Sequence, residues 1–207
     1  MSVGIQSFNA GEHRWMNRAH TPTEALESLE ATARLFPNYS LDLIYGIPGS
    51  NMELWADNLK QALQFNPPHI SAYALTVEPR TALSSFIAKG RSADVDEGEA
   101  QEQFEHLVQT LTGVGYDHYE ISNFAQPGFY SRNNSAYWQG ETYLGIGPAA
   151  HSFDGEKRWW NPSNKSLYIR AMDKGEIQTE FEILTLRDRY NEAVMTGLRS
   201  RWGVSVK

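Results

Sequence analysis

Three polar side chains lie within, or directly after, segments that are otherwise apolar. Gln6 lies in the run 3–8, Asp42 lies in the run 41–45, and Arg18 follows the first of these runs. A carboxylate suits a ribose diol or an ammonium group, a guanidinium can hold a carboxylate through two hydrogen bonds, and an amide both donates and accepts. Together the three side chains could hold a small zwitterion that carries a ribose. Spacing alone nevertheless favours a plainer interpretation, in which they are hydrogen-bonded core groups.

A second candidate site is rich in aromatic residues. Residues 116–168 hold 12 of the 25 aromatic side chains, among them the adjacent pair Tyr137 and Trp138. Within this segment, residues 119–152 combine a candidate strand, a Pro-Gly turn and a glycine-punctuated loop. Tyr and Trp present flat apolar faces with a polar tip, which would suit the walls of a porphyrin site. The same rings are also typical of a hydrophobic core, and composition alone favours the core.

Composition argues against several function classes. The 207-residue chain has a formal net charge of −7, which disfavours a surface that follows nucleic-acid phosphates. Because it has no cysteine, its own residues cannot form a disulfide, a zinc–thiolate site, a thiolate nucleophile or a cysteine-ligated iron–sulfur cluster. Its six histidines show no HExxH spacing, so we expect no metal site made from this chain alone.

No apolar run approaches the roughly 20 residues that span a bilayer. The sequence also lacks a signal-peptide layout, and we therefore expect a cytoplasmic protein.

The elements that would position these residues alternate between strand and helix. Capping boxes at 21–24 and 50–53 each open a helix, and both helices follow apolar runs with strand character. This alternation is typical of parallel βαβ units, in which ligands bind at the carboxyl ends of the strands. We expect strands at 3–8, 41–45, 69–77 and 116–122, and helices at 21–36, 50–66, 81–89, 97–112, 163–174 and 185–200.

Seven motifs resemble, in chain order, those of the HemW-type proteins. They are SVGIQSFN, DLIYGIPG, HISAYALTVEP, YEISNFAQPG, NNSAYW, YLGIGPAAHS and RWWN. HemW-type proteins are radical S-adenosylmethionine proteins related to oxygen-independent coproporphyrinogen III oxidase. The resemblance covers essentially the whole chain, and the stretch TLRDRYNEAVMTGLR is similar to the opening of the family's C-terminal helical domain.

The resemblance implies an α/β fold, namely the second part of a partial (β/α)6 TIM-like barrel with parallel strands, plus the start of a C-terminal helical domain. We expect the partial barrel at 1–125, an aromatic-rich extension that packs on it at 126–180, and the start of the truncated helical domain at 181–207.

The resemblance also implies cofactors. The family binds a [4Fe–4S] cluster through a CxxxCxxC motif and uses it to cleave S-adenosylmethionine to a 5′-deoxyadenosyl radical. By similarity, Gln6, Arg18 and Asp42 would contact S-adenosylmethionine, with Asp42 on the ribose hydroxyls. Thr76, at the end of the third expected strand, is a further candidate.

Two departures from the family pattern shape the functional expectation. The cluster motif is absent, and the first strand resembles the family's fourth, so we expect a fragment that is inactive alone. The family's HNxxYW motif reads NNSAYW here, so an asparagine replaces the histidine that is associated with haem binding. Asparagine is a poor axial ligand for iron, and either haem binding is weakened or another group supplies the ligand. The haem or porphyrin candidates are Asn133, Asn134, Tyr137, Trp138 and His151.

Three functions fit this pattern. The first is a haem-binding chaperone that passes haem to a receiving protein, with S-adenosylmethionine bound alongside. The second is an oxidoreductase that decarboxylates coproporphyrinogen III by radical chemistry, and the third is an inactive scaffold fragment. The YEISNFA and NxxYW elements favour the first. The strand at 3–8 would be a bare parallel edge, so we also expect self-association through it.

Overall fold

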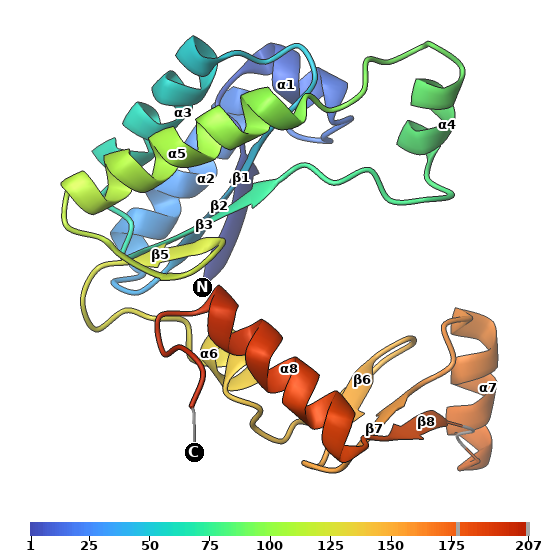
Figure 1. The fold of residues 1–207 in the computed structure, drawn as a ribbon. Helices are drawn as coiled ribbons and strands as arrows, with labels where there is room; N and C mark the ends of the chain where they lie inside the picture. The colour runs from blue at the N-terminus through green and yellow to red at the C-terminus, as the bar shows by residue number, and fades with distance from the viewer. Residues whose placement is uncertain (177–178, 206–207) are drawn as a thin grey trace. The chain divides into compact units, whose positions relative to one another are not determined.

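The computed structural model describes residues 1–176 and 179–205. The chain forms two compact units, Met1–Tyr130 and Ser131–Lys207 (Figure 1). The second unit contains most of the residues expected to form the aromatic-rich extension, from 131 onward, together with those expected to open a helical domain. The three-part division with boundaries at 125 and 180 stays a prediction.

The first unit is built on a five-stranded sheet. Its strand order is β1-β2-β3-β5-β4, with β1, β2 and β3 parallel and β5 antiparallel to both of its neighbours. The parallel strands confirm the expected βαβ pattern. The single strand expected at 116–122 is instead a hairpin, because the chain reverses at Ile121 and Ser122 and returns beside β3. The strands are β1 (Ser2–Gln6), β2 (Ser40–Tyr45), β3 (His69–Ala74), β4 (Asp117–Glu120) and β5 (Asn123–Ala125).

The helices of this unit begin at residues whose side chains cap them. The expected capping box of Thr21 and Glu24 opens α2, with Pro22 at its start. The cap of α3 is Asn51 rather than Ser50, since the Asn51 side chain accepts from the Leu54 N–H at 2.9 Å. The helices are α1 (Ala10–Trp15), α2 (Pro22–Leu35), α3 (Met52–Gln64), α4 (Ala82–Ala88) and α5 (Glu97–Gly113).

The core lies between the sheet and the helices α2, α3 and α5 (Figure 1). Residues of β2 alternate, so that Leu41, Leu43 and Tyr45 are buried while Ser40 and Asp42 are half-buried. Side chains of a strand point alternately to its two faces. The apolar face of β2 therefore packs on helices, and its polar face is the opposite one, where a ligand could bind.

The second unit combines a small antiparallel sheet with three helices. The sheet order is β6-β7-β8, and the last two helices of the unit agree with those expected at 163–174 and 185–200, whereas the first was not expected. The three short strands were not expected. The elements are α6 (Arg132–Trp138), β6 (His151–Phe153), β7 (Lys157–Trp160), α7 (Lys165–Lys174), β8 (Glu180–Ile183) and α8 (Leu186–Arg199).

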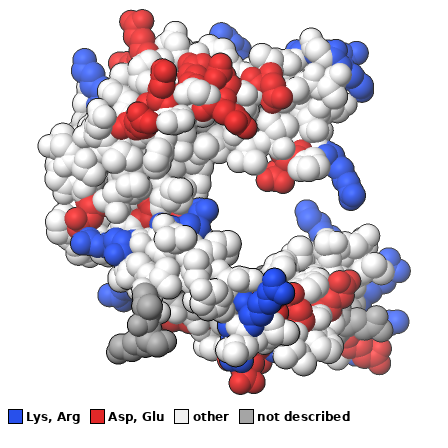
Figure 2. Space-filling model, viewed as in Figure 1, with Lys and Arg blue, Asp and Glu red and all other residues white. Residues whose placement is uncertain are grey.

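Two surface properties bear on possible partners. Acidic side chains gather over the outer helices of the first unit (Figure 2), where α5 alone exposes Glu97, Glu102 and Glu105. None of the helices in the described residues combines the length and the apolar character that a bilayer crossing requires.

Candidate functional sites

Gln6 and Arg18 meet at a glycine of the first strand. A Cβ atom on Gly4 would lie 2.5 Å from Nε2 of Gln6 and 3.9 Å from Nη2 of Arg18. The register of β1 with β2 shifts between Gly4 and Gln6, and Gln6 has a left-handed backbone with φ of 70°. Non-glycine residues held in this conformation are uncommon and gather at ligand sites. This irregularity in the strand pairing turns the Gln6 side-chain amide back over Gly4, where it lies beside the Arg18 guanidinium.

The loop that carries Arg18 is anchored by buried polar groups. The Arg18 N–H donates to the carbonyl oxygen of His13 at 3.0 Å, and His13 is 3% exposed. The neighbouring Glu12 carboxylate is also buried, and it accepts hydrogen bonds from Ser7, Ser50 and Asn58. Arg18 itself is exposed. A guanidinium on a fixed loop can therefore reach a ligand without a large loss of backbone entropy.

Asp42 lies on the same face of the sheet as these two side chains. It is the register partner of Gly4 across the parallel pair β1–β2, and partnered residues of neighbouring strands project to one face. Its carboxylate accepts hydrogen bonds from the Ser2 hydroxyl at 3.0 Å and the Ser40 hydroxyl at 3.3 Å. Burial raises the pKa of Asp42, while the serine hydrogen bonds lower it. The structure thus places Gln6, Arg18 and Asp42 around one strip of sheet.

A chain of hydrogen bonds leads away from Asp42, and sequence reasoning missed it. Ser40 lies 2.8 Å from Nδ1 of His69, and Nε2 of His69 lies 2.7 Å from the Tyr119 hydroxyl. Burial lowers the pKa of His69 to about 4, so near neutral pH one ring nitrogen donates and the other accepts. The sequence feature that could have indicated this chain of hydrogen bonds is the period-two alternation of polar and apolar residues in β2 and β3. That alternation places Ser40, Asp42 and His69 on one face of the sheet.

Thr76 occupies a different position. It follows β3 and lines a cavity of about 590 Å³ together with Tyr45 and Phe104. Gln6, Arg18 and Asp42 are not among the residues that line this cavity. Of the S-adenosylmethionine candidates, Gln6, Arg18 and Asp42 therefore lie around one strip of the sheet, whereas Thr76 lines a separate cavity.

The second unit has a larger cavity, of about 910 Å³. Three of the five haem candidates, Tyr137, Trp138 and His151, line it. Asn133 and Asn134 belong to the same helix, α6, but lie one turn earlier and do not contribute to the lining. Within the described residues, the sequence motif therefore contributes its last two positions to the cavity and not its first two.

Aromatic rings and one close backbone approach shape this cavity. The His151 ring stacks on Trp160 with centroids 5.5 Å apart, and Tyr137 meets Tyr143 edge-on at 4.7 Å. A Cβ atom on Gly145 would lie 2.0 Å from the carbonyl oxygen of His151. Only glycine allows the loop to pass this close to the start of β6, and this contact helps to fix the position of His151.

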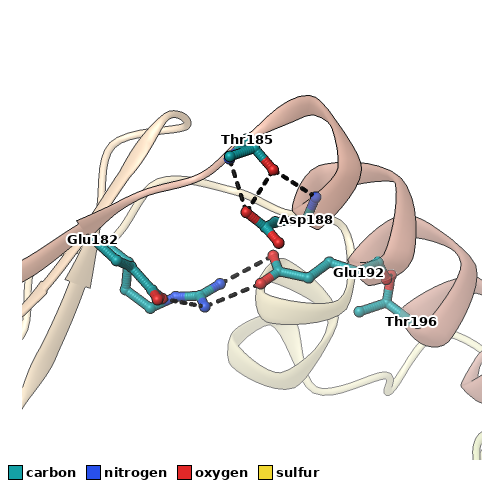
Figure 3. Close-up of polar contacts among 6 residues, drawn as sticks. Glu182, Thr185, Asp188, Glu192 and Thr196 are labelled. Atoms are coloured by element: carbon teal, nitrogen blue, oxygen red, sulfur yellow. Dashed lines mark hydrogen bonds and ion pairs between the residues drawn. The ribbon is translucent and has the colours of Figure 1, made fainter.

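Lining residues from β7, β8 and α8 were not found by sequence reasoning. Arg158 forms ion pairs with Glu182 at 3.1 Å and with Glu192 at 3.0 Å (Figure 3). Both guanidinium Nη atoms of Arg158 donate to Glu192, and this hydrogen bonding raises the pKa of Arg158. Met195, one turn along α8 from Glu192, also lines the cavity. Because these groups come from elements far apart in the sequence, no local motif indicates them.

The sequence is similar over its whole length to bacterial proteins named heme chaperone HemW. The protein from Lactococcus lactis is 32% identical over 208 residues, which cover 100% of this chain and 55% of that protein. The protein from Mycobacterium tuberculosis strain H37Rv is 34% identical over 206 residues, which cover 99% of this chain and 53% of that protein. The protein from Escherichia coli K12 is 37% identical over 153 residues, or 73% of this chain and 39% of that protein. The chain thus spans about half the length of the curated relatives it matches from end to end.

A solved structure shares the fold. Coproporphyrinogen III oxidase (HemN) from Escherichia coli, described as a radical SAM enzyme, matches with a TM-score of 0.75 at 23% identity. The match covers 96% of this chain and 49% of that chain. This likeness confirms the expected α/β, TIM-like fold class. No model of a protein family matches the sequence.

Proposed function

We propose that this chain, whose sequence is of the HemW type within the radical S-adenosylmethionine proteins, binds haem in the cavity of its second unit. The observation that carries the proposal is the lining of that cavity, which gathers Tyr137, Trp138 and His151. In the full-length protein, bound haem would be passed on to a receiving protein.

The size and chemistry of the cavity support haem as the ligand. Its volume of about 910 Å³ lies within the range of sites for flat, drug-sized or larger ligands. Aromatic rings line it, and they suit the faces of a porphyrin. Imidazole and thioether groups are common axial ligands of haem iron, and His151 and Met195 supply one of each. No other described residue forms a hydrogen bond with the His151 ring nitrogens.

Haem titration followed by the Soret absorbance tests this function. We expect His151→Ala to shift the Soret maximum and to weaken haem affinity by about tenfold, the loss that one iron–ligand contact of roughly 1.4 kcal/mol would cause. His106→Ala, on α5 of the first unit, is the matched control and should bind like the wild type. An unchanged spectrum for His151→Ala would remove this residue from the iron site. Absence of saturable binding by the wild type would refute the function.

The first unit supports a second part of the proposal, a site for S-adenosylmethionine. Gln6 and Arg18 lie against Gly4, and Asp42 is the register partner of that glycine. This donor set fits the cofactor, because the Asp42 carboxylate would accept from the ribose hydroxyls and the Arg18 guanidinium would hold the carboxylate. When bound beside a reduced cluster, the cofactor supplies radical chemistry in this family. The chain has no cysteine, so its residues do not fit the [4Fe–4S] cluster and we derive no reaction step for it.

Coproporphyrinogen oxidation is the alternative function. Its support is a likeness of fold, at 23% identity, to an oxidase that the chain covers by 49%. The relatives with higher identity are named as heme chaperones. The chaperone reading therefore has the better support, and the ligand preference of the cavity offers a direct way to separate the two.

A further inference from the structure

We infer that the cavity of the second unit selects iron porphyrins with two carboxylates over those with four. This inference rests on the proposed haem-binding function and names the class of ligand that the same cavity accepts. It follows from the charges that line the cavity and from the way in which carboxylates are arranged around the two kinds of macrocycle.

The charged residues that line the cavity include more acids than bases. Within the described part of the chain they comprise two guanidinium groups and three carboxylates, from Arg158, Arg189, Glu141, Glu182 and Glu192. A carboxylate that enters this space leaves water and meets an excess of like charge. Transfer of an unpaired carboxylate out of water is costly. The lining therefore disfavours any ligand that must bring carboxylates inside.

One of the two guanidinium groups, that of Arg158, is already ion-paired with acidic side chains. Arg158 donates to both carboxylate oxygens of Glu192 at 3.0 Å and also pairs with Glu182 at 3.1 Å (Figure 3). A ligand carboxylate would have to displace one of these acids and leave it unpaired. Arg189 is exposed and forms no ion pair among the residues that the structure describes. Among the lining residues that the structure describes, Arg189 is therefore the one guanidinium without an ion pair.

The arrangement of carboxylates decides which macrocycle can enter. In haem the two propionates lie on adjacent pyrrole rings, so the opposite edge carries only apolar groups. That edge can enter among the aromatic rings while the propionates stay at the solvent side, one of them within reach of a guanidinium. In a coproporphyrin each of the four pyrrole rings carries a propionate. Whichever edge enters first, it carries carboxylates toward Glu182 and Glu192.

The test is a paired titration of the whole chain with iron protoporphyrin IX and iron coproporphyrin III, each followed by its Soret absorbance. We expect the dicarboxylate to bind at least about tenfold more tightly, a ratio that corresponds to roughly 1.4 kcal/mol. Glu192→Gln removes one of the two carboxylates that pair with Arg158, so it should bring the affinities for the two porphyrins closer together. Glu182→Gln should act in the same direction with less disturbance of the packing. Arg189→Gln should weaken binding of the dicarboxylate.

Glu156→Gln is the matched control, because Glu156 is exposed and does not line the cavity. It should leave the ratio unchanged, and circular dichroism of every variant checks that it is folded. Equal affinity for the two porphyrins would overturn the inference and leave haem binding intact. Tighter binding of the coproporphyrin would overturn it and support the oxidase alternative. If neither porphyrin binds to saturation, the proposed function itself fails.

Discussion

At the scale of single residues, the polar face of the sheet is organised around Asp42. Two serine hydroxyls donate to its carboxylate, and Ser40 connects it to His69 and Tyr119. The hydrogen-bond roles are consistent along the chain, because neutral His69 can donate to Ser40 and accept from Tyr119 while Ser40 donates to Asp42. Such a network fixes the carboxylate in one orientation, as a site that accepts from a diol requires.

The first prediction concerns this carboxylate. Asp42→Asn keeps the shape of the side chain but removes its charge and converts one acceptor into a donor. We expect S-adenosylmethionine to bind about tenfold more weakly, because a hydrogen bond to a charged group contributes roughly 1.5–3 kcal/mol. Equilibrium dialysis with labelled cofactor measures the change. Asp57→Asn is the control, since the Asp57 side chain lies on the exposed face of α3 and accepts from Gln61. Wild-type affinity in Asp42→Asn would contradict the assignment.

The second prediction concerns the pH dependence of stability. The pKa of His69 falls from 6.5 to about 4 on burial, so between these values the unfolded chain binds a proton that the folded protein does not. The free energy of unfolding therefore rises with pH across this window. About 3 kcal/mol is fully present above the unfolded pKa and is lost as the pH falls to the folded one. Asp42, whose pKa burial raises, has the opposite effect in the acidic part of the window.

Urea unfolding at about pH 7 and about pH 4.5 measures this dependence. His69→Gln should reduce the difference in the free energy of unfolding between the two pH values, whereas His106→Gln on α5 should leave that difference unchanged. If His69→Gln and the wild type lose equal stability on acidification, the buried histidine is not the source.

At the scale of elements, one glycine loop determines where β6 begins. Gly145 passes against the His151 carbonyl, and its N–H donates to the Ser152 hydroxyl at 2.9 Å. Ser152 is 1% exposed, so the loop is held at a buried point of the second unit. The element that carries His151 is therefore positioned by contacts with the Gly145 backbone, while the His151 ring lines the cavity and stacks on Trp160.

The third prediction tests that contact. Gly145→Ala places a methyl group 2.0 Å from the carbonyl oxygen of His151, and the loop or β6 must shift. We expect the free energy of unfolding to fall by about 1–3 kcal/mol, the usual cost of overpacking, and haem affinity to fall with it. Gly113→Ala is the control, since no atom beyond its chain neighbours and the backbone of its own helix lies within 4 Å of the added Cβ, and its φ is not positive. Unaltered stability in Gly145→Ala would show that the approach is not tight.

At the scale of the whole molecule, the two proposed sites belong to different compact units. The S-adenosylmethionine candidates lie in Met1–Tyr130, and the residues of the larger cavity lie in Ser131–Lys207. The first unit also ends its sheet with β1, which pairs with β2 alone among the described strands. An edge strand presents unpaired backbone groups that can pair with a second chain.

The fourth prediction concerns this edge. We expect the chain to self-associate through β1, so that light scattering gives a mass above that of the 23.4 kDa monomer at high protein concentration. Amide exchange at residues 2–6 should be slow in the associated form and should become faster on dilution. The amides of β2, a central strand, should exchange slowly at every concentration. A monodisperse monomer with fast exchange at residues 2–6 would contradict the prediction.

Local sequence signals account for much of the fold. The boxes of Thr21 with Glu24 and of Thr185 with Asp188 each predict a helix start, and both are present with both of their hydrogen bonds. The antiparallel strands β5 to β8 were missed because they contain three or four residues each. Segments this short carry no clear period, and their pairing depends on partners distant in the sequence.

The sequence by itself predicted the fold class, the resemblance to HemW-type proteins and the identity of the polar residues within the strands, because periodicity, capping and ordered motifs are local properties of the chain. Only the tertiary structure decided which of these residues meet. It joined Gln6 to Arg18 across Gly4, separated Thr76 from them, and placed His151 with Met195 rather than with Asn133 around one cavity. Such groupings arise from strand register and from packing between distant segments, and a one-residue change of register would turn each strand side chain to the opposite face.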